Sequence, residues 1–276
     1  MRHPLIAAKV FNEPWCVTDE TLAAIWRAVA EGVALPVPRA QDRYDDAPEE
    51  DDNDGASDIP VTGFTRVIPV FGILGKHLDS MEMQCGGCSI DKVSALLAAA
   101  DKDPDCERIV MVFHSPGGTV TGIPELAAKI RDVGTRKPVI AYTDGTCCSA
   151  ALWLASQADT FLCSPSSMVG SVGVRCMVLD QSERLAKEGI KAESITSGKY
   201  KDMGANHRPI TDDERKMMQA RVDSIGKAFR AALTASRTIA AEDMEGQTFS
   251  GEEAAAKGFV DGLANDLAEV LEQLGN

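Results

Sequence analysis

The chain has 276 residues, of which 44% are hydrophobic and 25% charged, enough for one sizeable core with an appendage. Its formal net charge of −14 argues against a nucleic-acid-binding surface, which needs clustered lysine and arginine. Lys9, Asn12 and Glu13 interrupt the N-terminus before an apolar signal core develops, and no window reaches the roughly 18 apolar residues of a membrane span. We therefore expect a soluble, intracellular protein that binds neither nucleic acid nor membranes.

The N-terminal part of the chain is predicted to lie outside the main domain. Residues 18–31 have the apolar spacing of a short amphipathic helix. The stretch that follows is rich in proline and holds nine acids and one arginine within a run of 17 residues, which is typical of a solvated, disordered linker. We predict an N-terminal helical appendage (1–35), an acidic disordered linker (36–60) and a main domain (61–276).

Within the main domain, strand patterns alternate with helix patterns. The predicted strands lie at 66–74, 108–115, 138–143, 160–163, 171–179 and 191–196. The predicted helices lie at 89–100, 122–133, 143–159 and 181–189, and capping boxes at Thr211–Glu214 and Ser250–Glu253 open two more, the first reaching about Ser236. This alternation predicts an α/β fold with a mostly parallel sheet covered by helices on both faces.

The eight cysteines are predicted to be free thiols, because the interior of a cell is reducing. Cys85 and Cys88 have the spacing of a metal-binding or redox pair, but no second pair and no nearby histidine completes a site. A tight glycine turn is the favoured interpretation, and the sequence predicts no metal and no cofactor.

Two neighbouring strands end in residues suited to acyl transfer. The strand at 108–115 leads into Ser115-Pro-Gly-Gly118, where adjacent glycines can aim backbone N–H groups at a developing oxyanion. The next strand leads through a glycine turn to Ser149, at the start of an apolar helix whose N-terminus adds further donors. Ser149 is the candidate nucleophile, with Cys147 and Cys148 as rivals.

A nucleophilic serine needs a base, and the residues alone leave its identity open. None of the four histidines has a context that supports a Ser-His-Asp triad: His3, His77, His114 and His207. The polar loop at 194–211 offers Lys199 and Lys201. A lysine accepts a serine proton only where burial holds its pKa well below the usual value of about 10.4, and composition alone favours the interpretation that both lysines are solvated loop charges.

Four motifs in a fixed order carry a resemblance to a known family. They are SPGG (115–118), SAALWLASQAD (149–159), GSVGV (170–174) and SGKYKD (197–202), and the tail GQTFSGEEAAAKGFVDGL (246–263) also matches. The chain resembles the signal peptide peptidase A (protease IV) family of serine peptidases within the Clp protease/crotonase superfamily. It is most similar to the phage branch of head maturation or capsid assembly proteases, and the similarity covers about residues 61–265.

The resemblance implies a fold of repeated ββα units and a serine endopeptidase with a Ser-Lys dyad. It makes Ser149 the nucleophile, Lys201 the general base and Ser171 the hydroxyl that orients the lysine. The backbone N–H groups that it assigns to the oxyanion hole are those of Gly117 or Gly118 and of Ala150. No metal or cofactor is required for this chemistry.

The resemblance also implies a polypeptide substrate, such as a scaffold or coat protein, in the host cytoplasm or the procapsid interior. The enzyme would be a homo-oligomeric ring or dome, in which serine and lysine can meet across a subunit boundary. Ala150 and Ala151 follow the serine where membrane members of the family have Gly-Gly, and the membrane anchor is missing. The alternatives are a cytosolic signal-peptide-peptidase-like protease of a bacterium, a crotonase-type acyl-CoA enzyme and a catalytically silent head-assembly protein.

Overall fold

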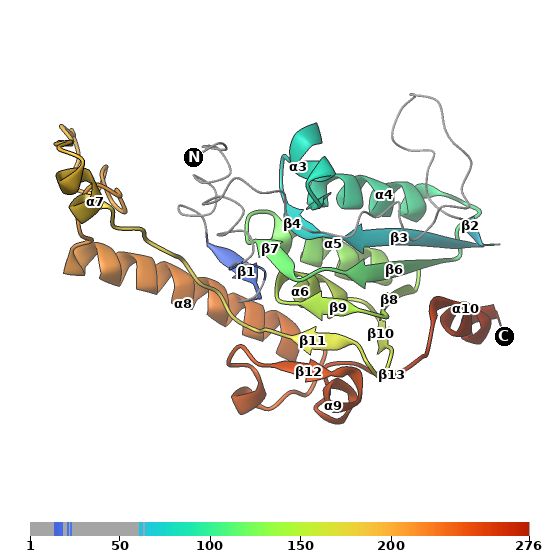
Figure 1. Cartoon of the computed structure of the whole chain (residues 1–276). Coiled ribbons are helices and arrows are strands. Elements are labelled where there is room, and N and C mark those ends of the chain that lie inside the picture. Colours follow the sequence, from blue (N-terminus) through green and yellow to red (C-terminus); the bar gives the residue numbers. More distant parts are fainter. Residues whose placement is uncertain (1–13, 19–20, 22, 24–60, 63, 276) are drawn as a thin grey trace.

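The computed structural model of the chain describes residues 14–18, 21, 23, 61–62 and 64–275 (Figure 1). Most of the predicted N-terminal helix pattern and the whole of the predicted acidic linker lie outside these residues. The division of the chain into appendage, linker and main domain therefore stays a prediction.

A six-stranded sheet forms the centre of the fold, with the strand order β13-β10-β8-β6-β3-β2. Its strands are β2 (Val61–Thr62), β3 (Thr65–Phe71), β6 (Arg108–His114), β8 (Val139–Thr143), β10 (Thr160–Cys163) and β13 (Gly262–Leu263). Every neighbouring pair is parallel except β2 and β3. The central strands β6 and β8 are buried over nearly their whole length, as expected for a parallel sheet covered on both faces.

Two smaller sheets continue from the carboxyl ends of these strands. One has the order β1-β7-β4-β5 and consists of β1 (Trp15–Val17), β4 (Ile73–Gly75), β5 (Gly87–Ser89) and β7 (Gly117–Thr119). The other has the order β12-β11-β9 and consists of β9 (Thr146–Cys148), β11 (Met168–Gly170) and β12 (Thr248–Ser250). Each of β3, β6 and β8 is thus followed by a second short strand that lies outside the main sheet.

Helices complete the layers on both faces of the main sheet. The short helix α3 (Ser80–Gln84) precedes α4 (Ile90–Lys102), while α5 (Ile123–Gly134) follows β7 and α6 (Ala150–Ala155) follows β9. These last two helices complete the ββα units β6-β7-α5 and β8-β9-α6. On the other face, α10 (Leu267–Gly275) packs against alternate residues of the same strands, including Val110 and Val112 of β6. The predicted α/β fold with a mostly parallel sheet is confirmed.

A long helix extends beyond this body. Helix α8 (Asp212–Thr234) begins at the predicted capping box, in which Thr211 and Glu214 satisfy each other's backbone N–H groups. Its C-terminal half packs on the body, where Phe229 stacks on Trp153 of α6 with ring centroids 4.8 Å apart. Its N-terminal half leads away from the sheets and carries α7 (Ser182–Lys187) at its far end (Figure 1). The chain returns through a 3-10 turn (Ala241–Asp243) to β12 and α9 (Gly251–Ala256), whose capping box is also confirmed.

Four of the predicted elements differ from the structure. The strand predicted at 66–74 is divided into β3 and β4 by Gly72, whose φ of 98° turns the chain from one sheet into the other. The helix predicted at 143–159 is in fact β9 followed by α6. The segments 171–179 and 191–196 are not strands, because the first leaves the sheets along α8 and the second is exposed to solvent.

The contact between α6 and α8 can be tested by removing the Phe229 ring. Phe229→Ala is expected to lower the free energy of unfolding by about 3–5 kcal/mol, because the ring is fully buried and stacked on Trp153. Chemical denaturation followed by circular dichroism measures this loss. Met217→Ala is the matched control, because that side chain is 44% exposed on the same helix. Equal losses in the two variants would contradict the described packing.

Candidate active site

Ser149 lies at the corner where β9 ends and α6 begins. Its backbone has φ 56° and ψ −118°, a conformation that residues with a side chain adopt rarely and at a cost of about 1–3 kcal/mol. The Ser149 N–H donates to the Gly170 carbonyl at 2.8 Å, and the Ser149 carbonyl accepts from Trp153 N–H at 2.9 Å. These two bonds hold the strained corner between β11 and the first turn of α6.

The Ser149 hydroxyl is buried, and its Oγ has no hydrogen-bond partner within the described part of the chain. The thiol of Cys16, in β1, lies beside it. A buried hydroxyl without a partner costs about 1–3 kcal/mol, so such a group calls for an explanation. A nucleophile whose base comes from another part of the assembled protein would explain this hydroxyl.

The tandem glycines of β7 lie directly against this serine. A Cβ on Gly117, which has φ +104°, would lie 2.9 Å from the Ser149 Cβ and 2.1 Å from the Cys16 carbonyl oxygen. A Cβ on Gly118 would lie 2.0 Å from the Leu74 carbonyl oxygen. Only glycine fits at either position, and the absence of side chains brings the β7 backbone into contact with Ser149.

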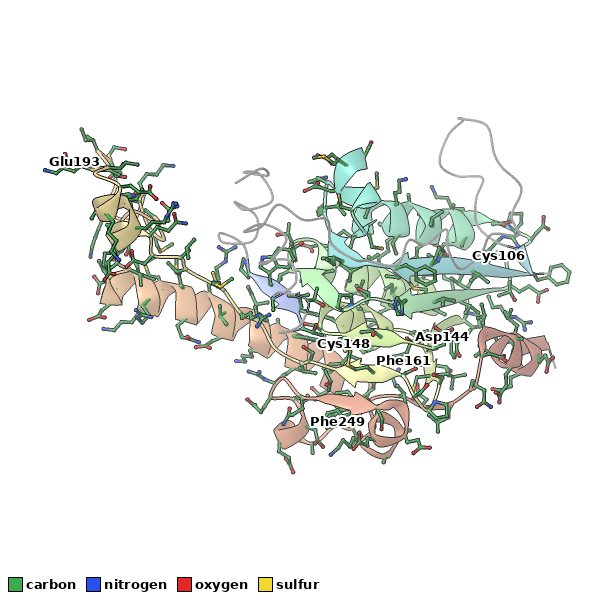
Figure 2. All side chains as sticks on the ribbon, viewed as in Figure 1. Cys106, Asp144, Cys148, Phe161, Glu193 and Phe249 are labelled. Carbon is green, nitrogen blue, oxygen red and sulfur yellow. The ribbon has the colours of Figure 1, made fainter. Side chains whose placement is uncertain are left out.

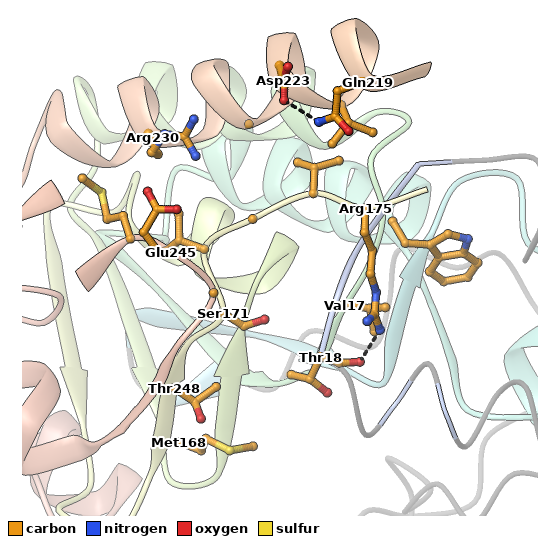
Figure 3. A pocket seen from close by; sticks show the side chains of 18 residues that line it. Val17, Thr18, Met168, Ser171, Arg175, Gln219, Asp223, Arg230, Glu245 and Thr248 are labelled. Carbon is orange, nitrogen blue, oxygen red and sulfur yellow. Dashed lines mark hydrogen bonds between the residues drawn. The ribbon is translucent and has the colours of Figure 1, made fainter. Parts of the chain in front are cut away.

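Ser171 follows Gly170, the residue whose carbonyl holds the Ser149 N–H, so the structure places the two serines close together. The Ser171 backbone has φ 57°, and its N–H donates to the Gln247 carbonyl at 2.6 Å. Ser171 also lines a cavity of about 600 Å³ between β1, the segment after β11 and α8 (Figure 3).

The predicted site residues fall into two groups in space. Those that the structure brings together at the β9–α6 corner are Ser149, Ala150, Gly117, Gly118 and Ser171. Lys201 is not among them, because it lies exposed in the turns between α7 and α8. In Figure 2, Glu193 marks the outer end of this region, while Cys148, next to Ser149, lies in the body.

The region that carries Lys201, residues 176–211, is called the arm below. Arg208 anchors it to the start of α8 by donating to the Glu214 carboxylate at 2.7 Å and to the Asp202 carboxylate at 3.0 Å. Glu214 lies in the first turn of α8, and Phe229 lies where α8 packs on α6. At a rise of 1.5 Å per residue, the two are separated by about 22 Å along the helix axis. The Lys201 turn is therefore held at the end of α8 away from the serine of its own chain.

Comparison with known proteins identifies the family of this chain. The model of peptidase family S49 matches residues 131–276, which is more than half of the chain. The chain belongs to peptidase family S49. The family expected from the sequence motifs is confirmed.

Three proteins illustrate the similarities of this S49 chain. It is 28% identical to the capsid assembly protease C of Escherichia phage lambda over 95% of this chain and 63% of that protein. It is 33% identical to a putative protease of Methanocaldococcus jannaschii over 66% of this chain and 60% of that protein, so it spans about three fifths of the length of each. Among solved structures, a mutant of the 1510-N membrane-bound stomatin-specific protease matches with a TM-score of 0.41 and 16% identity, covering 78% of this chain and 86% of that chain.

Of the two candidate lysines, Lys199 is already engaged. Its Nζ lies 3.0 Å from an Asp213 carboxylate oxygen, and the pKa of Lys199 is raised to about 12, first by hydrogen bonding to Tyr200 and then by Asp213. Lys201 forms no ion pair with the residues that the structure describes. The S49 chain thus presents Lys201, rather than Lys199, as the amine that a second group can approach.

The carboxylates that Arg208 binds on the arm and at the start of α8 stay ionised at neutral pH. The Arg208 guanidinium, followed by the Thr211 N–H, lowers the pKa of the Glu214 carboxyl to about 2. The pKa of Asp202 is lowered by the Ser194 hydroxyl first and by Arg208. Because both pKa values are depressed, this anchor contributes fully to stability above the ordinary carboxyl pKa range, and the Glu214 contribution is lost progressively as the pH falls from there to about 2.

The described histidines do not supply a base to Ser149. His77 is exposed and pairs with Asp91, with Nδ1 and Oδ2 3.2 Å apart. The Nδ1 atom of His114 accepts from the Thr146 N–H, and His207 lies on the arm. None of them bonds to the Ser149 Oγ, which has no partner among the described residues.

The cysteines next to the serine are protonated core residues. Burial raises the pKa of Cys147 well above its ordinary value and that of Cys148 to about 12, so neither forms a thiolate near neutral pH. Cys85 and Cys88 are free thiols on either side of a turn at Gly86, which has φ 91°. Within the described ranges, no three His, Cys, Asp or Glu side chains are placed to hold a metal ion, and no helix has both the length and the hydrophobicity of a membrane span.

Thiol alkylation provides a test of these assignments. At pH 8, iodoacetamide is expected to modify the exposed Cys85 in the folded protein and to leave Cys147 and Cys148 unmodified, because both are buried and their raised pKa values keep them protonated. Mass spectrometry of proteolytic peptides measures each site, and denatured protein provides the fully labelled reference. Equal labelling rates at Cys148 and Cys85 would show that the Cys148 thiol is accessible and reactive.

Proposed function

We propose that the protein is a serine endopeptidase that uses Ser149 and Lys201 as a dyad. The observation that carries this proposal is the buried Ser149 Oγ, which has no hydrogen-bond partner among the described residues and is held in a strained corner against the tandem glycines of β7. Acyl transfer needs a nucleophile next to backbone donors that can hold an oxyanion, and this corner combines them. Membership of peptidase family S49 supports the same conclusion.

The proposed reaction is hydrolysis of a peptide bond through an acyl-enzyme. Neutral Lys201 accepts the Ser149 proton while the Oγ attacks the substrate carbonyl carbon. The C–N bond then breaks, and Lys201 gives the proton to the leaving amine. Water, activated by the same lysine, releases the acyl group from the serine. Ser171 would orient the lysine by hydrogen bonding to its amine.

Backbone N–H groups of β7 and of the start of α6 would stabilise the oxyanion. Gly117 N–H already donates to the Ser115 Oγ at 3.2 Å, within the turn before β7, whereas Gly118 is paired with Cys16 of β1, on the edge of β7 where a substrate strand would bind. Gly118 is therefore the better donor of the two glycines, and the Ala150 N–H at the N-terminus of α6 is the second donor.

The dyad is proposed to form between two copies of the chain. The arm, which carries Lys201, lies at the far end of α8 from the body that holds β9 and α6, between which Ser149 lies (Figure 1). Large apolar side chains are exposed on the arm, where Ile195 is 97% exposed, Ile190 49% and Tyr200 39%. A neighbouring copy would cover such a surface. If each arm reaches the next serine in the same direction, the contacts are head-to-tail and close into a ring or dome.

The proposed substrates are scaffold or coat proteins of a phage head, cut in the host cytoplasm or the procapsid interior. Similarity to the lambda capsid assembly protease over 95% of this chain supports this choice. Co-expression with candidate scaffold and coat proteins, followed by mass spectrometry of the cut ends, tests it. Cleavage of host proteins alone would favour a cytosolic housekeeping protease instead.

The nucleophile is tested by two neighbouring substitutions. Ser149→Ala is expected to lower peptidase activity by at least about 10³-fold, because it removes the attacking oxygen. Cys148→Ala is the matched control and is expected to retain activity within a few fold. Activity on a peptide substrate and labelling by a fluorophosphonate probe are the measurements, with circular dichroism to confirm folding. An inactive Cys148→Ala beside an active Ser149→Ala would reverse the assignment.

The division of the dyad between copies is tested by mixing inactive chains. Ser149→Ala and Lys201→Ala are each expected to be inactive alone, while co-expression restores activity. In a head-to-tail ring with random mixing, about a quarter of the sites combine an intact serine with an intact neighbouring lysine. Lys199→Ala is the control and should remain active by itself. Mixed oligomers confirmed by mass but without activity would place the dyad within one chain.

A further inference from the structure

Residues Pro14–Thr18 lie between β7 and the segment that carries Arg175, and Cys16 lies beside the candidate nucleophile. On one side, β1 pairs antiparallel with β7, which carries the tandem glycines. On the other side, Trp15 and Arg175 exchange two backbone hydrogen bonds, of 2.9 and 3.0 Å, and an Arg175 side-chain nitrogen donates to the Thr18 carbonyl at 3.1 Å (Figure 3). The segment is therefore bonded as a strand along both of its edges.

The register brings one carbonyl of this strand to the proposed oxyanion donor. Thr18 N–H donates to the Pro116 carbonyl and Val120 N–H to the Pro14 carbonyl, at the two ends of the β1–β7 ladder. Hydrogen-bonded pairs alternate along antiparallel strands, so the pair between these ends, Cys16 and Gly118, is also hydrogen-bonded. The Cys16 carbonyl thus faces the Gly118 N–H.

The same carbonyl lies beside the serine. The Cys16 carbonyl oxygen is 2.1 Å and the Ser149 Cβ 2.9 Å from the point that a Cβ on Gly117 would occupy, so these two atoms are no farther apart than the sum of those distances. The Cys16 thiol contacts the Ser149 hydroxyl, and burial raises the pKa of this thiol to about 12. Cys16 and Ser149 are each 1% exposed, so β1 closes the nucleophile off from solvent.

A peptide that Ser149 attacks must satisfy the same two constraints. Its carbonyl carbon has to approach the Oγ while its carbonyl oxygen approaches the glycine N–H groups. This requires an extended backbone along the edge of β7 that β1 occupies. One edge of a strand pairs with one partner at a time. A peptide substrate and β1 therefore exclude each other.

We propose that residues 14–18 occupy the peptide-binding groove as an intramolecular pseudosubstrate, so that the chain blocks its own serine until this strand is displaced. The proposal rests on the peptidase function of Ser149. It also defines the class of substrate: an extended peptide with a residue as small as Cys16 facing the serine. The two flanking positions of the substrate would hold apolar side chains, because Trp15 and Val17 are buried at these positions of β1.

A reversible crosslink tests this block in the full-length chain. Trp15 and Arg175 form a hydrogen-bonded antiparallel pair, whose Cα separation of about 5.5 Å suits a disulfide. The double variant Trp15→Cys, Arg175→Cys is expected to cleave a peptide substrate at least tenfold more slowly when oxidised than when reduced. Peptide mapping confirms the crosslink, and the unsubstituted protein with and without reductant is the control. Equal rates in the crosslinked and reduced forms would overturn the proposal.

A binding measurement separates this proposal from the peptidase function. Ser149→Ala is added to the double variant, and a fluorescent peptide with the sequence of residues 12–20, serine replacing cysteine, is titrated by anisotropy. At least tenfold tighter binding to the reduced form supports the groove assignment, even if no variant cleaves peptides and the proposed function fails. Equal affinity for the two forms, or no binding to either, overturns it, even if the protein is an active peptidase.

Discussion

The hydrogen bond from the Ser149 N–H to the Gly170 carbonyl fixes the corner on which the site depends. It holds Ser149 at a positive φ, which turns the side chain toward β7. Strain of this kind persists only where the surroundings determine the conformation more strongly than local preference does. Here the surroundings are the whole of α6, whose residues are all buried, and the bare backbone of Gly117, which leaves room for the serine.

The packing that fixes the serine also separates it from the lysine. Stacking of Trp153 on Phe229 ties α8 to α6, so the direction of α8 is set by the same helix that begins at Ser149. The arm is in turn tied to the start of α8 by Arg208 and Glu214. Nucleophile and proposed base are thus attached to two ends of one rigid element. The proposed dyad would become complete only by association, which would make activity depend on protein concentration.

Much of the fold could be predicted from local signals in the sequence. The capping boxes at Thr211 and Ser250 marked the starts of α8 and α9, because a hydroxyl and a glutamate three residues apart satisfy the first backbone donors. The buried strands β6 and β8 were evident as short apolar runs. The segment at 143–159 was misjudged because small apolar residues lack the periodicity that separates a strand from a helix.

Other features depend on contacts that no local pattern encodes. The apolar–polar alternation at 191–196 predicted a strand, but a strand also needs a partner, and this segment lies exposed on the arm. The three residues of β1 are too few for a pattern, and only their pairing with β7 makes them a strand. Ser149 and the glycines could be chosen as candidates because parallel strands end at one edge of a sheet. Cys16 was missed, and the distance between Ser149 and Lys201 had no signal in the sequence.

The edge of β7 opposite β4 connects the chemistry of the site with the proposed block by β1. β7 pairs with β4 on one side, and on the other its backbone groups need a second partner, because unpaired donors and acceptors at a buried edge are costly. An extended peptide supplies that partner whatever its side chains, so the edge recognises a backbone, while the small space at Cys16 selects what faces the serine. An attached strand competes at an effective concentration set by the chain that connects it to the body. A substrate that displaces it must therefore be presented at comparable local concentration, a condition that an enclosed assembly of enzyme and substrate meets and a dilute solution does not.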